Sequence, residues 1–356
     1  MRPGALDSAL ADAGADAFVH AGPPGDPVVS YLAGAPLPCR AAVVYGGRVA
    51  VVPARPVPDH VDVRADVTVL DPRAAPAKRL PSLVADAVLA PRAIPHDAAL
   101  YLEGDGVEVS STTAHEEARS RKTDRETDAL RAAVAAAEAG LEAAAGLLAA
   151  ADTTGDAPTE SDEPVTAERV RRAANAAVAS AGAAAETTVQ PAGPVEPGVP
   201  LHVEVAATVD GYRAPVFRTF VPDTDGGWDR RATLGCEYGV EAAWEIVEPG
   251  ETTATRAGSE ATAELASLGF PPETTEVDVH GVGLERREAP TGGDALVEGA
   301  IVSVSAVAEP DEANGGSEEA AADLGPVGVS DVAVVTDEGA ERVGSFPRSV
   351  VPKPDY

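Results

Sequence analysis

The chain has 356 residues, of which 44% are hydrophobic, so it is long enough for two domains and apolar enough to bury a core in each. It carries 58 acidic and 27 basic side chains, a net charge of −31, and its basic residues are almost all arginines. Nucleic-acid binding is disfavoured, because no basic stripe is present to neutralise phosphates.

Neither a membrane span nor a metal-binding cysteine motif is expected. No segment reaches about 18 apolar residues without charge, and the N-terminus has no uninterrupted apolar segment, so we expect a cytoplasmic protein. Cys39 and Cys236 lie far apart without metal-site spacing, and we interpret both as small buried apolar residues.

The first part of the chain, residues 1–120, alternates helical and strand patterns, which predicts a small α/β domain. Residues 5–22 predict a helix followed by a strand. Two apolar runs joined by Gly46-Gly47 predict a hairpin. Residues 62–72 predict a short strand, and residues 80–90 predict a helix.

A long helix is predicted from about residue 123, where Thr123 and Glu126 have the spacing of a capping box. Its apolar residues recur on one face: Leu130, Val134, Ala137, Leu141, Ala145 and Leu148. A turn-rich acidic loop at 151–163 ends it, and we interpret this loop and a second one at 309–323 as solvated surface.

The rest of the chain alternates helices and antiparallel strand signals. Period-2 alternation on both sides of Asp210-Gly211 predicts a hairpin. Further predicted elements are helices at 166–182, 230–247 and 254–270, a strand at 299–309 and a strand pair at 327–343.

Several motifs occur in a recognisable order: "VVSYLAGAPLPCRAAVVYGGRVAVV", "RSRKTDRETDALRAAV", "VDGYRAPVFRTF", "VEPGETTATRAGSEATAELASLGF" and "HGVGLERREAP". Together they resemble the "pita-bread" family of Xaa-Pro peptidases, methionine aminopeptidases and creatinase. The resemblance implies an α+β fold. A creatinase-like α/β domain would span residues 1–120, and a pita-bread domain with a curved antiparallel sheet flanked by helix pairs would span 121–356. It also implies a homodimer.

The family's peptidases bind two divalent metals through two Asp, one His and two Glu, and the metals activate a water molecule. By the resemblance these ligands fall on Glu204, Pro215, His280, Ser305 and Ser330. One ligand is kept, one carboxylate is a methylene longer, and three are lost. Proline has no side-chain donor and serine is a poor ligand for a hard divalent ion, so we expect no metal and no cofactor.

Other positions leave alternatives open. Glu309 follows Ser305 by four residues, about 13 Å along a strand, and would replace it only if a bulge shifted the strand. The family's second loop histidine is Arg287, beside Glu288. Metal-free creatinases use a histidine ahead of the hairpin, and none stands there. His202 shares a strand face with Glu204 and is a second stand-in, though we interpret it as a core-edge residue.

The candidate catalytic residues are therefore His280 and Glu288, although an isolated Glu288 is more typical of an ion-pair partner of Arg286 or Arg287. The expected ligand pocket comprises Glu204, Tyr212, Arg218, His280, Arg287, Ser305 and Ser330. For Tyr212 and Arg218, packing between strands is the alternative.

Three function classes remain. The first is a catalytically silent binding or regulatory protein, or pseudoenzyme, for a small or peptide-like ligand. The second is a hydrolase with an altered, metal-free site. The third is a true metallopeptidase with a different register on the late strands.

The acidic, lysine-poor, alanine-rich composition is similar to that of halophilic archaeal proteins. At roughly 1 M salt the Debye length is about 3 Å, so a dense acidic surface is tolerated there. We expect folding to require molar salt, because the surface repels itself without screening.

Overall fold

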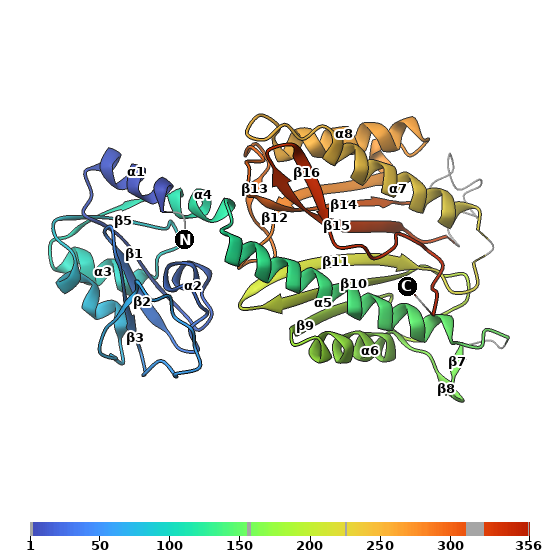
Figure 1. The fold of residues 1–356 in the computed structure, drawn as a ribbon, viewed down its shortest axis with the longest axis horizontal. Coiled ribbons are helices and arrows are strands. Elements are labelled where there is room, and N and C mark those ends of the chain that lie inside the picture. The colour runs from blue at the N-terminus through green and yellow to red at the C-terminus, as the bar shows by residue number, and fades with distance from the viewer. Residues whose placement is uncertain (1–2, 155–157, 225, 311–323, 355) are drawn as a thin grey trace. The chain divides into compact units, whose positions relative to one another are not determined.

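The computed structural model describes residues 3–154, 158–224, 226–310, 324–354 and 356. Most of the second acidic loop, and residues 155–157 of the first, lie outside the described residues. The chain divides into two compact units, Met1–Thr123 and Asp124–Tyr356 (Figure 1).

The first unit contains a six-stranded sheet of order β4-β3-β2-β1-β5-β6, with helices packed against it. Its elements are α1 (Gly4–Ala13), β1 (Ala17–Gly22), α2 (Pro27–Ala33), β2 (Ala41–Tyr45), β3 (Val49–Pro53), β4 (Thr68–Val69), the 3-10 helix η1 (Pro76–Leu83), β5 (Ala87–Ala90), α3 (His96–Gly104), β6 (Glu108–Ser111) and α4 (Ala114–Ser120). The hairpin at Gly46-Gly47 is confirmed as the antiparallel pair β2 and β3.

The expected helix at 80–90 is wrong in its second half. η1 ends at Leu83, and residues 87–90 form β5, which lies between β1 and β6. Val88 and Ala90 are buried in the core of this unit. A short run of buried apolar residues fits a central strand as well as a helix, so periodicity could not separate the two.

The second unit contains a larger sheet whose main path has the order β13-β12-β14-β15-β11-β10-β9, with β16 paired to β15. Its elements are α5 (Asp124–Ala149), β7 (Thr159–Glu160), β8 (Glu163–Pro164), α6 (Ala167–Ser180), β9 (Ala184–Gln190), β10 (Leu201–Val209), β11 (Tyr212–Phe220), α7 (Trp228–Glu245), α8 (Ala254–Ser267), η2 (Pro272–Thr274), β12 (Thr275–Gly281), β13 (Glu288–Thr291), β14 (Ile301–Ala308), β15 (Val327–Thr336) and β16 (Gly339–Val343). All pairs in this sheet are antiparallel.

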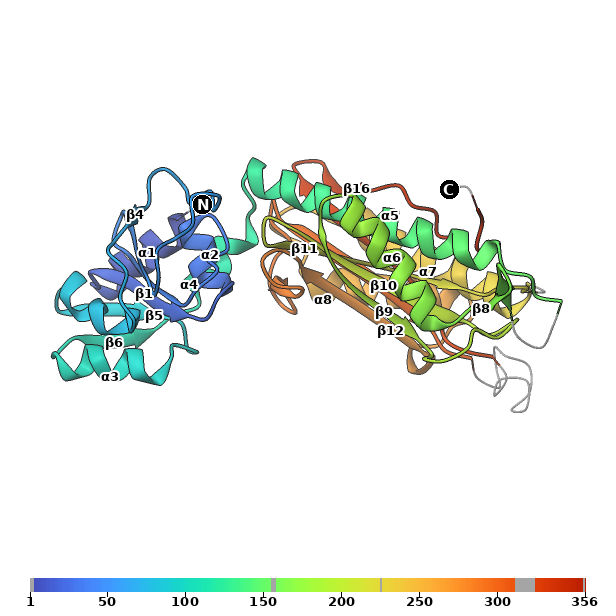
Figure 2. The ribbon, with the colours of Figure 1, turned by 90° about the horizontal axis from the view of Figure 1, so that it is seen from below.

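Two helix pairs pack against this sheet. α5 and α6 cover β9, β10 and β11, and Figure 2 shows these two helices along one side of those strands. α7 and α8 cover β12, β14 and β15. Each pair has its own cluster of buried apolar side chains, one around α5 and one around α7.

The predicted apolar face of the long helix is confirmed, because all six of its residues are at most 2% exposed. α5 is, among the described residues, the one helix long and apolar enough to cross a membrane by length and composition. Half of the most apolar stretch of α5 is buried within the protein. The helix packs there on α6, β10 and β11. The two cysteines are free and buried, as expected.

Candidate functional site

The larger sheet has one face covered by helices and one face that the helices leave open. Val203 and Val205 of β10 pack in the α5 cluster, and Val302 and Val304 of β14 pack in the α7 cluster. Side chains alternate between the two faces along a strand, and directly opposed residues on paired antiparallel strands share a face.

The register places all five positions of the implied metal site on the face without helices, which we call the open face. Glu204 of β10 is opposite Phe217 of β11. The next residue of β11, Arg218, pairs with Val329 of β15, so Phe217 and Ser330 are neighbours on one face. Ser330 is in turn opposite Ser305 of β14. Ser305 is opposite Asp278. Pro215 and His280 lie two positions along their strands from Phe217 and Asp278, and so share this face.

The two serines therefore stand side by side where the resemblance implies two glutamates. Ser330 is only 3% exposed, and its Oγ accepts a hydrogen bond of 2.8 Å from the backbone N–H of Phe217. The hydroxyl thus satisfies a backbone donor at the junction of β11 and β15, where the register has the single pair Arg218–Val329. Ser330 has a structural role at this junction.

Phe217 gives the open face an apolar floor that sequence reasoning missed. A Cβ placed on Gly328 would lie 3.1 Å from the Phe217 ring and 2.8 Å from the Val307 side chain, so both cover this glycine closely. The ring of His202 is 6.3 Å from that of Phe217, centroid to centroid. Position 217 was not among the site residues expected from the sequence, and the neighbours of its ring come from distant strands.

Two arginines of the loop between β12 and β13 form ion pairs on the open face. Arg286 pairs with the carboxylate of Glu204, and Arg287 pairs with that of Asp278. All four side chains are partly exposed. Two guanidiniums thus face two carboxylates in this region. Asp278 was not singled out from the sequence, although it lies two residues before His280.

Glu288, a candidate acid or base, is mostly buried, and its Oε2 accepts a hydrogen bond of 3.2 Å from the backbone N–H of Glu285. Its Oε1 also lies close to Gly283. These contacts give the Glu288 carboxylate a role in shaping the loop. The two arginines form their ion pairs with other carboxylates.

His280 is held by its own strand. Its Nδ1 lies 3.0 Å from the carbonyl oxygen of Gly281, which only accepts, so Nδ1 carries the hydrogen and Nε2 of the neutral ring has the lone pair. Nε2 is 3.8 Å from Oδ2 of Asp278. Burial lowers the pKa of His280 below its ordinary value, and the nearby arginines act in the same direction. The imidazole is therefore neutral at neutral pH.

Tyr212 and Arg218 were expected at the pocket rim and lie elsewhere. Both share the strand parity of Val216 and point to the helix-covered face. Tyr212 donates a hydrogen bond of 2.8 Å to Glu126 of α5. Arg218 is fully buried and binds Asp331 at 2.6 Å. The alternative role, bridging strands and helices, is the one the geometry supports.

His202 and Glu309 do not complete the site either. The Nε2 of His202 hydrogen-bonds the carbonyl of Pro326 at 2.9 Å, and its Nδ1 lies 3.1 Å from Oγ1 of Thr219, so the ring links two segments. The register of β14 with β15 runs without a shift from Ile301 to Ala308. Glu309 consequently stays past the end of the strand and does not move into the place of Ser305.

The residues at the five positions do not fit a pair of divalent metal ions. They supply one carboxylate and one imidazole, and the carboxylate already pairs with Arg286. Hard divalent ions prefer several carboxylate oxygens or imidazoles, and serine hydroxyls and proline do not replace them. Within the described ranges no group of three or more His, Cys, Asp or Glu side chains is arranged to hold a metal ion.

An antiparallel sheet with a helix pair on each half, and a histidine at the end of the strand before the β12–β13 loop, is the arrangement of a pita-bread protein. The chain belongs to metallopeptidase family M24, whose sequence model matches residues 128–337. No curated protein matches the chain significantly.

Solved structures share this two-domain fold over nearly the whole chain. The prolidase from Pyrococcus horikoshii OT3 is 17% identical with a TM-score of 0.76, covering 98% of this chain and 99% of its own. The Xaa-Pro dipeptidase from Bacillus anthracis is 17% identical with a TM-score of 0.80, covering 98% of both chains. The N-terminal domain of FACT complex subunit SPT16 from Cicer arietinum is 14% identical with a TM-score of 0.71, covering 98% and 96%. At these identities the likeness establishes the fold alone.

Proposed function

We propose that this chain is a catalytically silent member of the M24 family that binds a small or peptide-like ligand on the open face without cleaving it. The observation that carries the proposal is the pairing of Ser305 with Ser330 across β14 and β15, where two carboxylates are needed to hold metal. Ser330 is already used to satisfy a backbone N–H.

The charge balance of the open face supports the same conclusion. Clustered carboxylates are tolerated when cations neutralise them, and here the cations are the guanidiniums of Arg286 and Arg287. Glu204 and Asp278 each have one such partner. The face keeps polar groups suited to orient a ligand: the His280 imidazole, the Ser305 hydroxyl and the outer N–H groups of both arginines. These lie beside the apolar ring of Phe217, a combination typical of small-ligand sites.

The fold also occurs in a protein described as a subunit of a complex, since the SPT16 domain matches over nearly the whole chain. The pita-bread fold is therefore not tied to a protein described as a peptidase, in line with the general separation of fold and function.

A metal-free hydrolase is the second candidate, and His280 is the observation that favours it. Its neutral ring has a lone pair on Nε2, as a general base requires, and Asp278 lies 3.8 Å away to stabilise the protonated ring. Arg287 competes for Asp278 and acts against protonation of His280. This competition makes hydrolysis the weaker of the two readings.

Peptide binding and peptide cleavage are tested together on the full chain. Xaa-Pro dipeptides and tripeptides are incubated with protein treated with a chelator, with and without added Mn²⁺, Co²⁺ or Zn²⁺. We expect no release of proline or of an N-terminal residue in any condition. Calorimetry is expected to detect binding of the intact peptides, which His280→Ala weakens about tenfold or more and Glu260→Gln, an exposed change on α8, leaves unchanged.

Each other outcome assigns a different function. Release that requires added metal would mean a working metallopeptidase. Release without metal that is lost in His280→Ala would support the second candidate. Neither binding nor release across the peptide series would overturn the ligand-binding proposal.

A further inference from the structure

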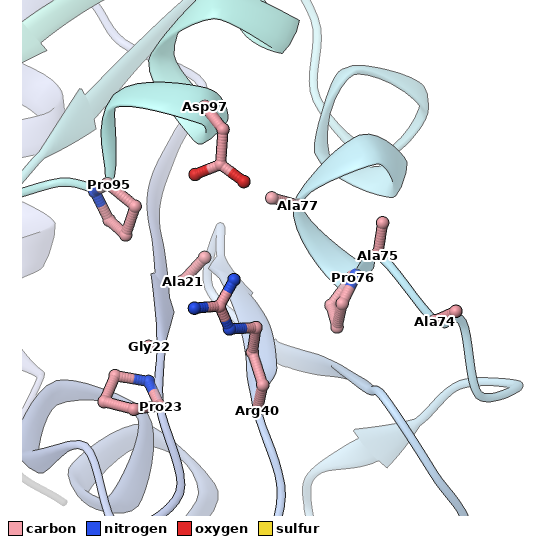
Figure 3. Close-up of a pocket in the computed structure, with 10 residues that line it drawn as sticks. All are labelled: Ala21, Gly22, Pro23, Arg40, Ala74, Ala75, Pro76, Ala77, Pro95 and Asp97. Atoms are coloured by element: carbon pink, nitrogen blue, oxygen red, sulfur yellow. The ribbon is translucent and has the colours of Figure 1, made fainter.

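The first unit contains a pocket of about 100 Å³ that is separate from the open face. It lies between the end of β1, the segment leading into η1 and the start of α3 (Figure 3). Its lining residues are Ala21, Gly22, Pro23, Arg40, Ala74, Ala75, Pro76, Ala77, Pro95 and Asp97.

Two opposite charges face each other in this pocket. Figure 3 shows the guanidinium of Arg40, just before β2, directed toward the carboxylate of Asp97 in the first turn of α3. Both side chains are exposed, and neither forms an ion pair or a side-chain hydrogen bond with any other residue that the structure describes. Carboxylates are plentiful in this chain, yet Arg40 is left with its donors directed into an open space.

The other walls are small and stiff. Alanine and proline supply seven of the ten lining residues, and Gly22 adds no side chain. Proline rings fix the backbone angle φ, so Pro23, Pro76 and Pro95 make the shape largely preformed. A preformed site loses little conformational entropy when it binds a ligand.

We propose that this pocket binds the zwitterion of a small α-amino acid such as alanine or glycine. The guanidinium of Arg40 receives the carboxylate through two parallel N–H groups, and Asp97 receives the ammonium. The aliphatic part packs against the alanine and proline walls. A space of about 100 Å³ favours a small amino acid over one with a large side chain. The inference does not rest on the function proposed for the open face.

Binding is tested with the full chain by equilibrium dialysis of labelled alanine and by competition. Because both charged groups are exposed, we expect a Kd in the millimolar range. N-acetylalanine lacks the ammonium, alaninamide lacks the carboxylate, and leucine is too large. Each is expected to compete at least about tenfold less well than alanine.

Variants separate this site from adventitious binding. Arg40→Gln and Asp97→Asn are each expected to weaken alanine binding by about tenfold or more. Figure 3 shows the methyl group of Ala77 directed toward Asp97, so Ala77→Leu is expected to abolish binding by filling the pocket with both charges intact. Arg48→Gln and Asp105→Asn change exposed residues of the same unit outside the pocket and are expected to bind like the unaltered chain. An unchanged melting temperature shows that each variant is folded.

Three results would overturn the assignment: no alanine binding up to about 100 mM, equal binding by Arg40→Gln and Asp97→Asn variants, or N-acetylalanine competing as well as alanine.

Discussion

Charged side chains in this protein fall into two groups whose energetic roles differ. Asp331 is 2% exposed and accepts from Arg218 and Arg348 at 2.6 Å and from Arg342 at 3.1 Å. Burial alone raises the pKa of Asp331, but the three guanidiniums outweigh it and hold the pKa below its usual value. The pairs on the open face, in contrast, are partly exposed to solvent.

The substitution Asp331→Asn is expected to destabilise the protein by about 3–5 kcal/mol, because it leaves the fully buried guanidinium of Arg218 without a counter-charge. Arg286→Ala breaks an exposed pair and is expected to change stability by less than about 1 kcal/mol. Denaturant unfolding of both variants measures the difference. Equal effects would contradict this division into buried and exposed pairs.

His115 makes stability depend on pH. It is 6% exposed, and burial, assisted by the charges of Arg119 and His20, lowers its pKa from 6.5 to about 4. The folded state therefore favours the neutral ring. This stability is present above pH 6.5 and is lost as the pH falls towards 4, by up to roughly 3 kcal/mol. Unfolding free energies between pH 4 and 7 should show this slope, and His115→Gln should reduce it, whereas exposed His60→Gln should not. An unaltered slope in His115→Gln would refute the assignment.

Among the helices, α5 has a close contact that limits what its sequence can be. A Cβ on Gly140 would lie 2.9 Å from the Val178 side chain of α6 and 3.1 Å from Val205 of β10. Gly146, in the same helix, has open space around this position. Packing therefore requires glycine at position 140 of α5 but not at position 146.

Gly140→Ala is expected to destabilise the protein, although alanine is intrinsically better in a helix by about 1 kcal/mol. Gly146→Ala gains the same preference without a clash and is expected to stabilise by about 0.5–1 kcal/mol. Thermal unfolding of the two variants gives opposite signs if the α5–α6 contact is as tight as described. Stabilisation by both would show that the contact relaxes at little cost.

The strands of the open face lead to a prediction about metal. Protein dialysed at high salt is expected to retain far less than one equivalent of Mn, Co or Zn, because Pro215, Ser305 and Ser330 supply no carboxylate. A ligand that binds the folded state raises the melting temperature. Because we expect no metal to bind, added metal should leave the melting temperature unchanged. Elemental analysis that finds close to two equivalents would defeat this expectation.

Local sequence patterns predicted the elements well where a periodic apolar pattern extended over many residues or where typical turn residues joined two strands. The α5 face and the hairpin around Asp210-Gly211 are of this kind. Residues 87–90 were predicted wrongly because a run of four apolar residues, three of them buried, shows no period. The pair of Arg286 with Glu204 spans 82 residues, and the floor formed by Phe217 depends on Gly328. Such contacts between distant segments leave no local signal in the sequence.

At the scale of the whole molecule, the net charge of −31 dominates. The melting temperature is expected to rise strongly between low and molar salt, because screening removes self-repulsion among the carboxylates. Calorimetric melts over a salt series measure this, and an unchanged melting temperature would count decisively against a salt-requiring protein. The expected homodimer remains a prediction, for which sedimentation in the same buffers is the measurement.

The junction between β11 and β15 separates the strands that α5 and α6 cover from β12, β14 and β15, which α7 and α8 cover. Side chains hold this junction together: Ser330 binds the Phe217 amide, Thr219 binds the Gly328 amide at 2.9 Å, and Arg218 binds the Ser330 carbonyl at 2.5 Å. We therefore expect the sheet to open locally at this junction before it unfolds globally. Amide hydrogen exchange at Phe217 and Gly328 would then report an opening at the junction that costs less free energy than global unfolding, and a ligand spanning the open face would slow that exchange.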